Sequence, residues 1–486
     1  MSFASLPFVG LVAAGVILYY LAPKRLQWVV LLLASMVFYL AGGVKSAVWL
    51  VLVAAVTWLT GLLLARQNAR PAPDKQTKAA VRRVKKRICA ACAVLCFGLL
   101  YLMKYWNFTA SALPSALGDK LPRWDFVVPM GLSYFIFQAV GYVIDVYRGK
   151  TDAQKNPLRY GLFVSFFPQM VQGPISRYDQ LAPQLTAERS LDWRDLKFGI
   201  QLCLWGYFKK LVIADRAAVL VNAVIQDNCP YGGAVIASGI LFYCIQLYCD
   251  FSGGIDITRG VARLFGIDMA ENFRRPIFAT SLTDYWRRWH ITLGDWFKSY
   301  IYFPMGGSRK GLPRTIINLL VVWTITGIWH GASWNFMMWG TYFGILIVIE
   351  RLFLGKVLEK IPAFFSWLYT FVMVVFGWVL FDAVAPGTVG FGDVFSQVWT
   401  YISAMFGGNG VFMDNAATNY IVNYGLIFAI CIFGSSDVLK TITEYIRKKA
   451  PVWVQYGFPV VNTVVMLASI AYLSTATYNP FLYFNF

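Results

Sequence analysis

The 486-residue chain has little charge, because only 14% of its residues are Asp, Glu, Lys or Arg, whereas soluble domains carry about 25%. It also lacks a polar stretch as long as a soluble domain, since apolar runs recur from Phe8 to Leu482. These two absences exclude an ordinary globular protein. With 58% hydrophobic residues, the sequence predicts an all-α polytopic membrane protein with one membrane domain over residues 1–486.

The sequence also lacks the motifs of several enzyme classes. It contains neither the GxSxG elbow of serine hydrolases nor the GxGxxG loop of dinucleotide-binding enzymes. Its only histidines, His290 and His330, have no carboxylate cluster at ligand spacing, so we expect no bound metal. Cys89 and Cys92 form a CxxC inside an apolar run without a second ligand pair, and we interpret them as small hydrophobic residues rather than a redox or metal site.

The positive charge is concentrated in short segments. The net charge is +19, and the basic residues cluster at the ends of apolar runs, which favours positive-inside topology over nucleic-acid binding. The most basic segment, Arg66–Arg87, is predicted to be a cytoplasmic loop. Three spans precede it, so the N-terminus should be external. No charged n-region or cleavage site precedes Phe8–Leu21, which we expect to be a retained span.

Roughly ten apolar elements are predicted along the chain. Beyond the first two spans they are Ala47–Ala65, Ile88–Trp106, Phe126–Val146, Gly232–Tyr248, Thr315–Trp329, Met337–Ile349, Phe364–Leu380, Tyr420–Phe433 and Pro459–Leu473. The segment between Arg159 and Arg177 is broken by Pro168, Gly173 and Pro174. A full crossing would place one arginine outside, so a re-entrant hairpin fits better, and a kinked ordinary span is the alternative. Residues 382–418 are expected to be an external loop with a short amphipathic piece.

His290 lies in a segment, Leu282–Ile301, whose apolar residues recur in steps of three and four. This spacing predicts one amphipathic helix, which Ser281 and Asp284 begin with capping-box spacing and which lies in the cytoplasmic interface. On that helix His290 falls beside Trp286 and Phe297 and points inward. A functional imidazole and a core histidine bonded to a backbone carbonyl both remain open for this position.

His330 follows Arg314 by 16 residues, or roughly 24 Å along a helix. An ionisable residue at membrane depth is costly and by default marks a site, and histidine suits a general base at neutral pH. Small residues surround it, and Gly327 and Gly331 form a GxxxG. We favour close helix packing for these glycines, with room for a substrate as the alternative.

Five segments together resemble the membrane-bound O-acyltransferase family, and within it the bacterial alginate O-acetylating branch. They are Val128–Gly149 (VPMGLSYFIFQAVGYVIDVYRG), Phe166–Arg177, Gln246–Ile257 (QLYCDFSGGIDI), Glu271–Arg309, which contains WRRWHI, and Thr326–Gly340 (TGIWHGASWNFMMWG). The resemblance implies that His330 is the catalytic histidine and His290 the second functional one. It also implies a ring of tilted helices around a tunnel that joins a cytoplasmic donor funnel to an external acceptor funnel. The tunnel-lining candidates are Trp286, Trp329, Ser333 and Asn335.

The function implied by this resemblance is transfer of an acyl group, expected to be acetyl, in the bacterial cell membrane. The donor would be acetyl-CoA or a carrier-protein thioester, without a bound cofactor, and Arg287, Arg288 and Lys298 would attract its phosphates or else contact lipid headgroups. The acceptor would be a cell-surface polysaccharide, reached through an exported or membrane-anchored partner of the SGNH type. The alternatives are D-alanyl transfer to teichoic acid and, in a different class, a transporter of a small anion or a lipid-linked sugar.

Overall fold

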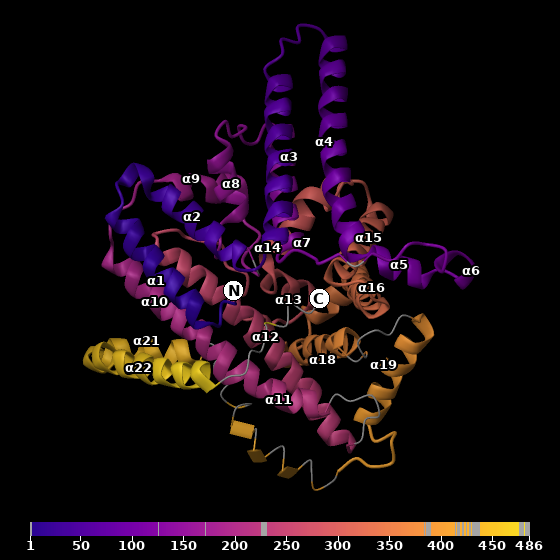
Figure 1. The fold of residues 1–486 in the computed structure, drawn as a ribbon. Coiled ribbons are helices and arrows are strands. Elements are labelled where there is room, and N and C mark those ends of the chain that lie inside the picture. Colours follow the sequence, from indigo (N-terminus) through magenta and orange to yellow (C-terminus); the bar gives the residue numbers. More distant parts are fainter. Residues whose placement is uncertain are drawn as a thin grey trace. The chain divides into compact units, whose positions relative to one another are not determined.

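The computed structural model is built from helices (Figure 1). It describes residues 2–486 except 125, 171, 225–230, 383, 385–389, 414, 416–417, 420–421, 424, 427–428, 430–437, 476–480 and 482–486. Within these residues the only β-type pairing outside helices is one antiparallel bridge between Phe273 and Trp289. The chain divides into two compact units, Met1–Cys203 with Ile255–Ala270, and Leu204–Gly254 with Glu271–Phe486.

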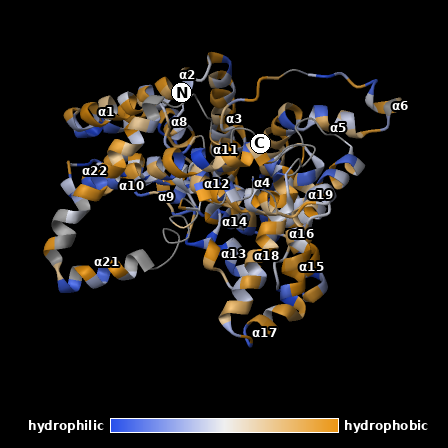
Figure 2. Ribbon diagram, turned by 90° about the horizontal axis from the view of Figure 1, so that it is seen from below, coloured by the Kyte–Doolittle hydropathy of each residue, from blue (hydrophilic) through white to orange (hydrophobic). Residues whose placement is uncertain are grey.

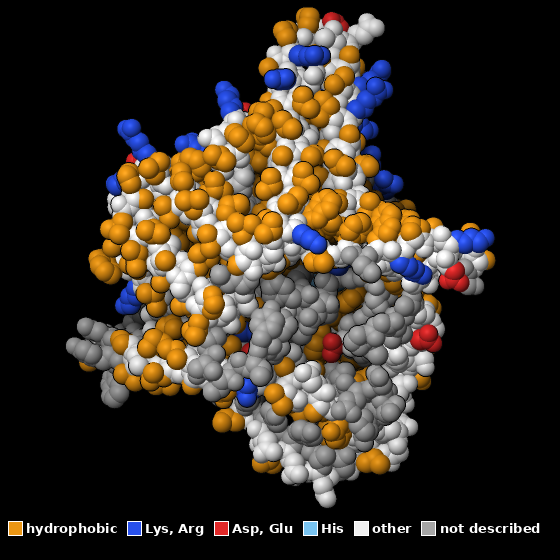
Figure 3. Space-filling view, viewed as in Figure 1, with side chains coloured by type: hydrophobic (Ala, Val, Ile, Leu, Met, Phe, Trp, Pro, Cys, Tyr) orange, Lys and Arg blue, Asp and Glu red, His pale blue; other side chains and the backbone are white. Residues whose placement is uncertain are grey.

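Within the described part of the chain, five helices are long and apolar enough to cross a membrane: α3 (Val44–Asn68), α4 (Lys75–Lys104), α12 (Gly233–Leu264), α15 (Leu312–His330) and α18 (Ala363–Asp382). Figure 2 shows apolar residues along most of these helices. Large apolar side chains also face outward, for example Val94, which is 72% exposed. Figure 3 shows such side chains covering much of the visible surface of the first unit. This exposure is what lipid contact requires, and the prediction of an all-α polytopic membrane protein is confirmed.

The first unit is centred on α7 (Leu132–Tyr147), which is almost completely buried and packs against α3 and α4. Its other helices are α1 (Leu6–Leu21), η1 (Lys24–Leu26), α2 (Gln27–Leu40), α5 (Trp106–Ala112), α6 (Ser115–Gly118), α8 (Pro157–Ser165), α9 (Tyr178–Thr186) and most of α10 (Trp193–Tyr207). Tyr160 donates a hydrogen bond to Thr57 Oγ1 (2.8 Å), and Tyr142 lies against Gly61, where a Cβ would be 2.6 Å from its hydroxyl. Buried tyrosines and a glycine therefore let α3 approach its neighbours closely.

The second unit carries both histidines. Its core is the antiparallel pair α15 and α16 (Trp334–Ile349), against which α18 packs. Its remaining elements are η2 (Phe208–Ala214), α11 (Asp215–Val224), most of α12, η3 (Pro276–Phe278), α13 (Leu282–Arg288), α14 (Ile291–Phe297), η4 (Lys298–Tyr302), η5 (Glu350–Leu354), α17 (Gly355–Leu358), α19 (Phe391–Met405), α21 (Val438–Lys449) and α22 (Pro451–Thr475).

Several boundaries differ from the sequence prediction. The basic segment 66–87 is mostly helix rather than loop, because α3 runs to Asn68 and α4 begins at Lys75, with Asp74 accepting from Thr77 N (2.8 Å). The helix predicted from Phe126 begins only at Leu132, since Pro129 has no N–H to donate and Gly131 has a φ of 72°. The amphipathic piece after α18 is the 15-residue α19. The span predicted at Tyr420–Phe433 falls largely outside the described residues.

The segment between Arg159 and Arg177 does not form one kinked helix. Helix α8 ends at Ser165, and α9 begins only at Tyr178. The described backbone between them is not helical, yet Phe166, Phe167 and Gln169 are fully buried in it. Protein groups satisfy part of its polar surface, because Ser35 Oγ accepts from Phe167 N (3.1 Å). This arrangement favours the hairpin interpretation, and its depth in the membrane stays a prediction.

Candidate active site

The helix predicted over Leu282–Ile301 is broken at His290. Helix α13 ends at Arg288, Trp289 is extended (φ −105°, ψ 128°), and His290 is left-handed (φ 46°, ψ 52°) before α14 begins at Ile291. The prediction of one continuous helix is therefore wrong, although Ser281 does cap its start by accepting from Asp284 N (3.0 Å). Periodicity missed the break because helices on both sides keep their apolar residues on the buried side.

Backbone pairing with the preceding segment holds this break in place. Arg274 N donates to Arg288 O (2.9 Å), and Ile291 N donates to Asn272 O (3.1 Å). The Asn272 side chain also accepts from Thr292 N and Thr292 Oγ1 (2.9 and 2.8 Å). A left-handed non-glycine residue costs roughly 1–3 kcal/mol, and such strain persists where surrounding contacts over-determine it. The fold thus fixes the direction of the His290 side chain.

A buried carboxylate fixes the other end of α13. Glu350, at the start of η5, is 6% exposed and accepts from Leu282 N (2.7 Å), Thr283 N (2.9 Å) and Thr283 Oγ1 (2.7 Å). An anion at a helix N-terminus is stabilised by the unpaired N–H groups and by the helix dipole. Glu350 therefore ties α13 to the end of α16. No sequence pattern indicated this contact.

His330 is the last residue of α15 and is 8% exposed. Its ring lies among aromatic rings, with centroids 5.0 Å from Trp329, 4.9 Å from Trp339 and 5.2 Å from Phe381. Close packing of α15 on α16 brings these rings together, since a Cβ on Gly327 would collide with Phe336 O and one on Gly331 with the Phe336 ring. The structure therefore supports the packing interpretation of the GxxxG.

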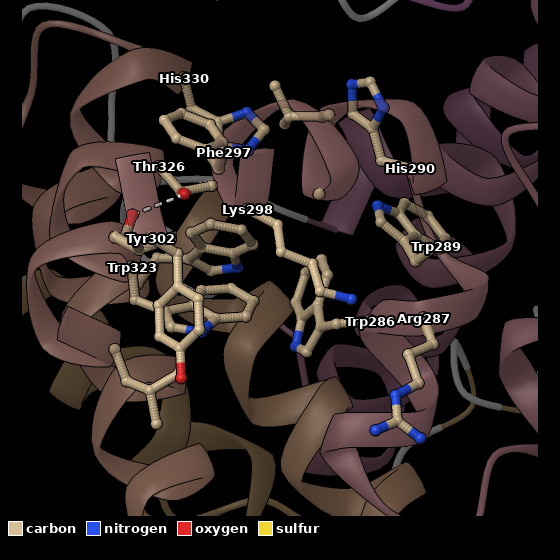
Figure 4. Close-up of a pocket in the computed structure, with 15 residues that line it drawn as sticks. Trp286, Arg287, Trp289, His290, Phe297, Lys298, Tyr302, Trp323, Thr326 and His330 are labelled. Carbon is tan, nitrogen blue, oxygen red and sulfur yellow. Dashed lines mark hydrogen bonds between the residues drawn. The ribbon is translucent and has the colours of Figure 1, made fainter. Parts of the chain in front are cut away.

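One cavity brings the two histidines together. It has a volume of about 310 Å³, and its walls come from α13, α14, η4, α15 and α16 (Figure 4). Its lining residues are Trp286, Arg287, Trp289, His290, Leu293, Gly294, Phe297, Lys298, Tyr302, Leu319, Val322, Trp323, Thr326, His330 and Trp339. The Trp329 ring contacts both imidazoles, because its centroid is 5.9 Å from that of His290 and 5.0 Å from that of His330. The volume falls at the low end of the ~300–1,000 Å³ of small-molecule sites.

The cavity is chemically asymmetric. In the view of Figure 4 both imidazoles lie at one end, and the Arg287 guanidinium and the Tyr302 hydroxyl lie at the other. Neither Arg287 nor Lys298 forms an ion pair within the described residues, so both charges are available to an anion. Arg288 is different, because its guanidinium pairs with Asp284 (2.9 Å) and it does not line the cavity.

The predicted tunnel-lining residues are placed in different ways. Trp286 lines the cavity, whereas Trp329 contacts the rings of both histidines but does not line the cavity. Neither Ser333 nor Asn335 lines it, and the Asn335 amide instead donates to Phe381 O (2.7 Å). The cavity is also lined by residues that were not predicted from the sequence, among them Trp289, Tyr302, Trp323, Thr326 and Trp339. Trp323 and Thr326 precede His330 by seven and four residues, a helical spacing that was a usable signal.

The cavity offers neutral polar groups as well as cations. His290 lies outside the five candidate spans, and burial lowers its pKa from 6.5 to about 3, so its imidazole is neutral at physiological pH. The indole N–H groups of Trp286 and Trp339 have no hydrogen-bond partner among the described residues, so each can donate to a ligand oxygen. In the described part of the chain no group of three His, Cys, Asp or Glu side chains could hold a metal ion.

Residues 31–384 match the model of the MBOAT, membrane-bound O-acyltransferase family. A probable alginate O-acetylase from Pseudomonas putida is 33% identical over 96% of both chains. A peptidoglycan O-acetyltransferase from Helicobacter pylori is 29% identical over 80% of both chains. A teichoic acid D-alanyltransferase from Bacillus subtilis is 26% identical over 58% of this chain and 74% of its own length. The matched residues include both histidines and every wall of the cavity.

Proposed function

This chain belongs to the membrane-bound O-acyltransferase family and is an acyltransferase, and from that premise we propose that it O-acetylates an extracytoplasmic cell-surface polysaccharide with a cytoplasmic thioester as donor. The observation that carries the proposal is the single cavity lined by His290 and His330 at one end and by Arg287 at the other. The family match extends over parts of both compact units, and we therefore treat residues 1–486 as one membrane domain.

His330 acts as the general base in this mechanism. The acceptor hydroxyl attacks the thioester carbonyl carbon, His330 takes the hydroxyl proton, and the C–S bond then breaks to release the thiol. A neutral imidazole near pH 7 can accept that proton. The unpaired indole N–H groups of Trp286 and Trp339 are suited to donate to the carbonyl oxygen as negative charge develops on it.

His290 and the basic residues act on the donor. The neutral His290 ring, fixed by the left-handed backbone, orients the thioester or the base. Arg287 and Lys298 bind donor phosphates, which favours a coenzyme A thioester over a bare acyl group. Contact with lipid headgroups is the competing role for these two cations. No bound cofactor is needed for this reaction.

The acceptor side of the proposal rests on the relatives. Two of them are named for alginate and peptidoglycan O-acetylation, which supports acetyl transfer to a polymer outside the cytoplasm of a bacterial cell. A tunnel through a ring of tilted helices would then connect the cytoplasmic donor to an external acceptor. An exported or membrane-anchored partner of the SGNH type would pass the acetyl group to the polymer.

The D-alanyltransferase relative keeps one second candidate open, which is aminoacyl transfer to teichoic acid from a carrier-protein thioester. Purified protein incubated with [14C]acetyl-CoA tests the proposal. We expect thiol release and label transfer that depend on His330. Activity with a D-alanyl carrier protein but not with acetyl-CoA would favour the second candidate. Neither activity, together with substrate-dependent uptake into vesicles, would favour a transporter.

A further inference from the structure

The second unit contains another cavity, next to the first and of similar size. It has a volume of about 330 Å³ and lies between α12, η3, α13 and α18. Its walls are almost wholly hydrocarbon, aromatic or thiol: Leu241, Cys244, Ile245, Tyr248, Cys249, Ile277, Phe278, Tyr285, Trp289, Trp367, Thr370, Phe371, Val374, Val375 and Trp378. No described Lys, Arg, Asp, Glu or His lines it. Such a cavity suits an alkyl chain and offers little to a polar ligand.

Among the residues that the structure describes, Trp289 is the only one that lines both cavities. It is 6% exposed, and it directly precedes His290. Its ring stacks on Tyr285 at 5.7 Å and packs at 5.2 Å from Trp378. Both of those neighbours line the hydrocarbon cavity and not the catalytic one. Trp289 therefore forms a wall shared by the cavity that holds the histidines and a space lined for an alkyl chain.

The backbone holds this shared wall in place. Trp289 forms the antiparallel bridge with Phe273, whose ring packs edge-on at 5.0 Å, and its N–H donates to Tyr285 O (2.9 Å). The extended conformation of Trp289 is fixed on one side by α13 and on the other by the left-handed His290. An acyl chain longer than the catalytic cavity accepts would have to displace this indole, and rigid aromatic packing resists that displacement.

We propose that Trp289 determines acyl-chain length: it limits the donor to a short acyl group by closing the catalytic cavity against the neighbouring hydrocarbon cavity. The inference rests on the proposed acetyl transfer. The reaction itself does not change with chain length, since the same C–S bond breaks, the same ester bond forms and His330 takes the same proton. Removing the indole would join the two cavities and let a longer chain lie beside Tyr248 and Val374.

The test compares kcat/KM for acetyl-, butyryl- and hexanoyl-CoA in the native protein, Trp289→Ala and Trp289→Leu. Each buried methylene contributes roughly fourfold to binding. We therefore expect the hexanoyl-to-acetyl ratio to rise at least ~10-fold in the variants, well below the full effect of four methylenes. Trp289→Leu keeps much of the apolar volume and provides a folded variant if Trp289→Ala is unstable.

Val374→Phe provides the matched control, because Val374 is buried in the wall of the hydrocarbon cavity alone. By itself it should leave acetyl transfer unchanged. Combined with Trp289→Leu it should refill the space and cancel most of the gain for hexanoyl-CoA. An unchanged ratio in both Trp289 variants overturns the inference. A gain that persists with Val374→Phe also overturns it, since the chain would then lie elsewhere.

A separate measurement keeps this inference distinct from the proposed function. Ligand-induced thermal stabilisation gives the affinity ratio of hexanoyl-CoA to acetyl-CoA without any turnover. If the native protein transfers no acetyl group but the affinity ratio rises in the Trp289 variants, the proposed reaction fails and the role of Trp289 stands. If acetyl transfer is normal and the affinity ratio does not move, the role of Trp289 fails and the reaction stands.

Discussion

Removing the Glu350 carboxylate should loosen the helix that forms one side of the cavity lined by the two histidines. In Glu350→Ala, Leu282 N, Thr283 N and Thr283 Oγ1 all lose their acceptor, and Leu282 is fully buried. A hydrogen bond to a charged group contributes about 1.5–3 kcal/mol, and three bonds to one carboxylate are not additive. We expect a loss of about 3–5 kcal/mol in unfolding free energy, because each buried donor left without an acceptor costs about 1–3 kcal/mol.

Thr283→Val tests the geometry behind that number. It removes only the hydroxyl bond of 2.7 Å, so we expect a loss of about 1–2 kcal/mol. In the Glu350→Ala background that bond is already absent, and Thr283→Val should then cost less than about 0.5 kcal/mol. The assay is unfolding of the detergent-solubilised variants, with donor KM measured in parallel, because α13 carries Trp286 and Arg287. Fully additive losses, or a Glu350→Ala protein with native stability, would refute the reasoning.

Four further predictions concern topology and the histidines. A cysteine at Lys75 should resist membrane-impermeant thiol reagents in intact cells, and ready labelling would invert the proposed orientation. His330→Ala should lower transfer by about 10²–10⁴-fold while leaving the protein inserted, and a normal rate in the purified variant would make His330 structural. Asparagine tolerates the left-handed backbone of position 290, so His290→Asn should change the melting midpoint little while weakening donor affinity. A large loss of stability with normal donor affinity would show that His290 does not act on the donor. Burial lowers the folded-state pKa of His290 from 6.5 to about 3, so its contribution to the free energy of unfolding is complete above about pH 6.5 and is lost as the pH falls toward 3. His290→Asn should therefore flatten the dependence of stability on pH between about 3 and 6.5. An unchanged pH dependence would contradict a buried, neutral His290.

Hydropathy predicted most of the helices correctly because length and apolar composition are local properties. The predicted spans at Ala47–Ala65, Thr315–Trp329 and Phe364–Leu380 all lie inside observed helices. It failed where the backbone departs from a helix without changing which residues are apolar. At His290 the break depends on Asn272 and Arg274, which are 18 and 16 residues earlier in the chain. No periodicity within Leu282–Ile301 contains that information.

The site could be predicted only in part for a similar reason. Rarity singled out both histidines, helical-wheel position added to the case for His290 and expected membrane depth to the case for His330, and the cavity does bring them together. The proposed role of Trp289 could not be predicted from the sequence, because it depends on Tyr285, Trp378 and a second cavity whose walls come from helices distant in the chain, α12 and α18 among them. The hydrogen bonds from α13 to Glu350 join residues 67 or 68 positions apart in the chain. In the sequence, Glu350 followed by Arg351 has no feature that distinguishes it from a surface glutamate.

The basic half of α4 has a consequence for how the chain is made. Seven lysines and arginines between residues 75 and 87 belong to one continuous helix of about 45 Å, longer than the ~30 Å hydrocarbon layer it would cross. A ribosome adding about 5–20 residues per second completes this stretch roughly 10–40 seconds before it reaches His290. Because such a dense run of positive charge resists translocation, the predicted topology would have the insertion machinery orient the nascent chain early. In the proposed topology, the direction in which His290 and His330 face would then be set before either residue has been synthesised.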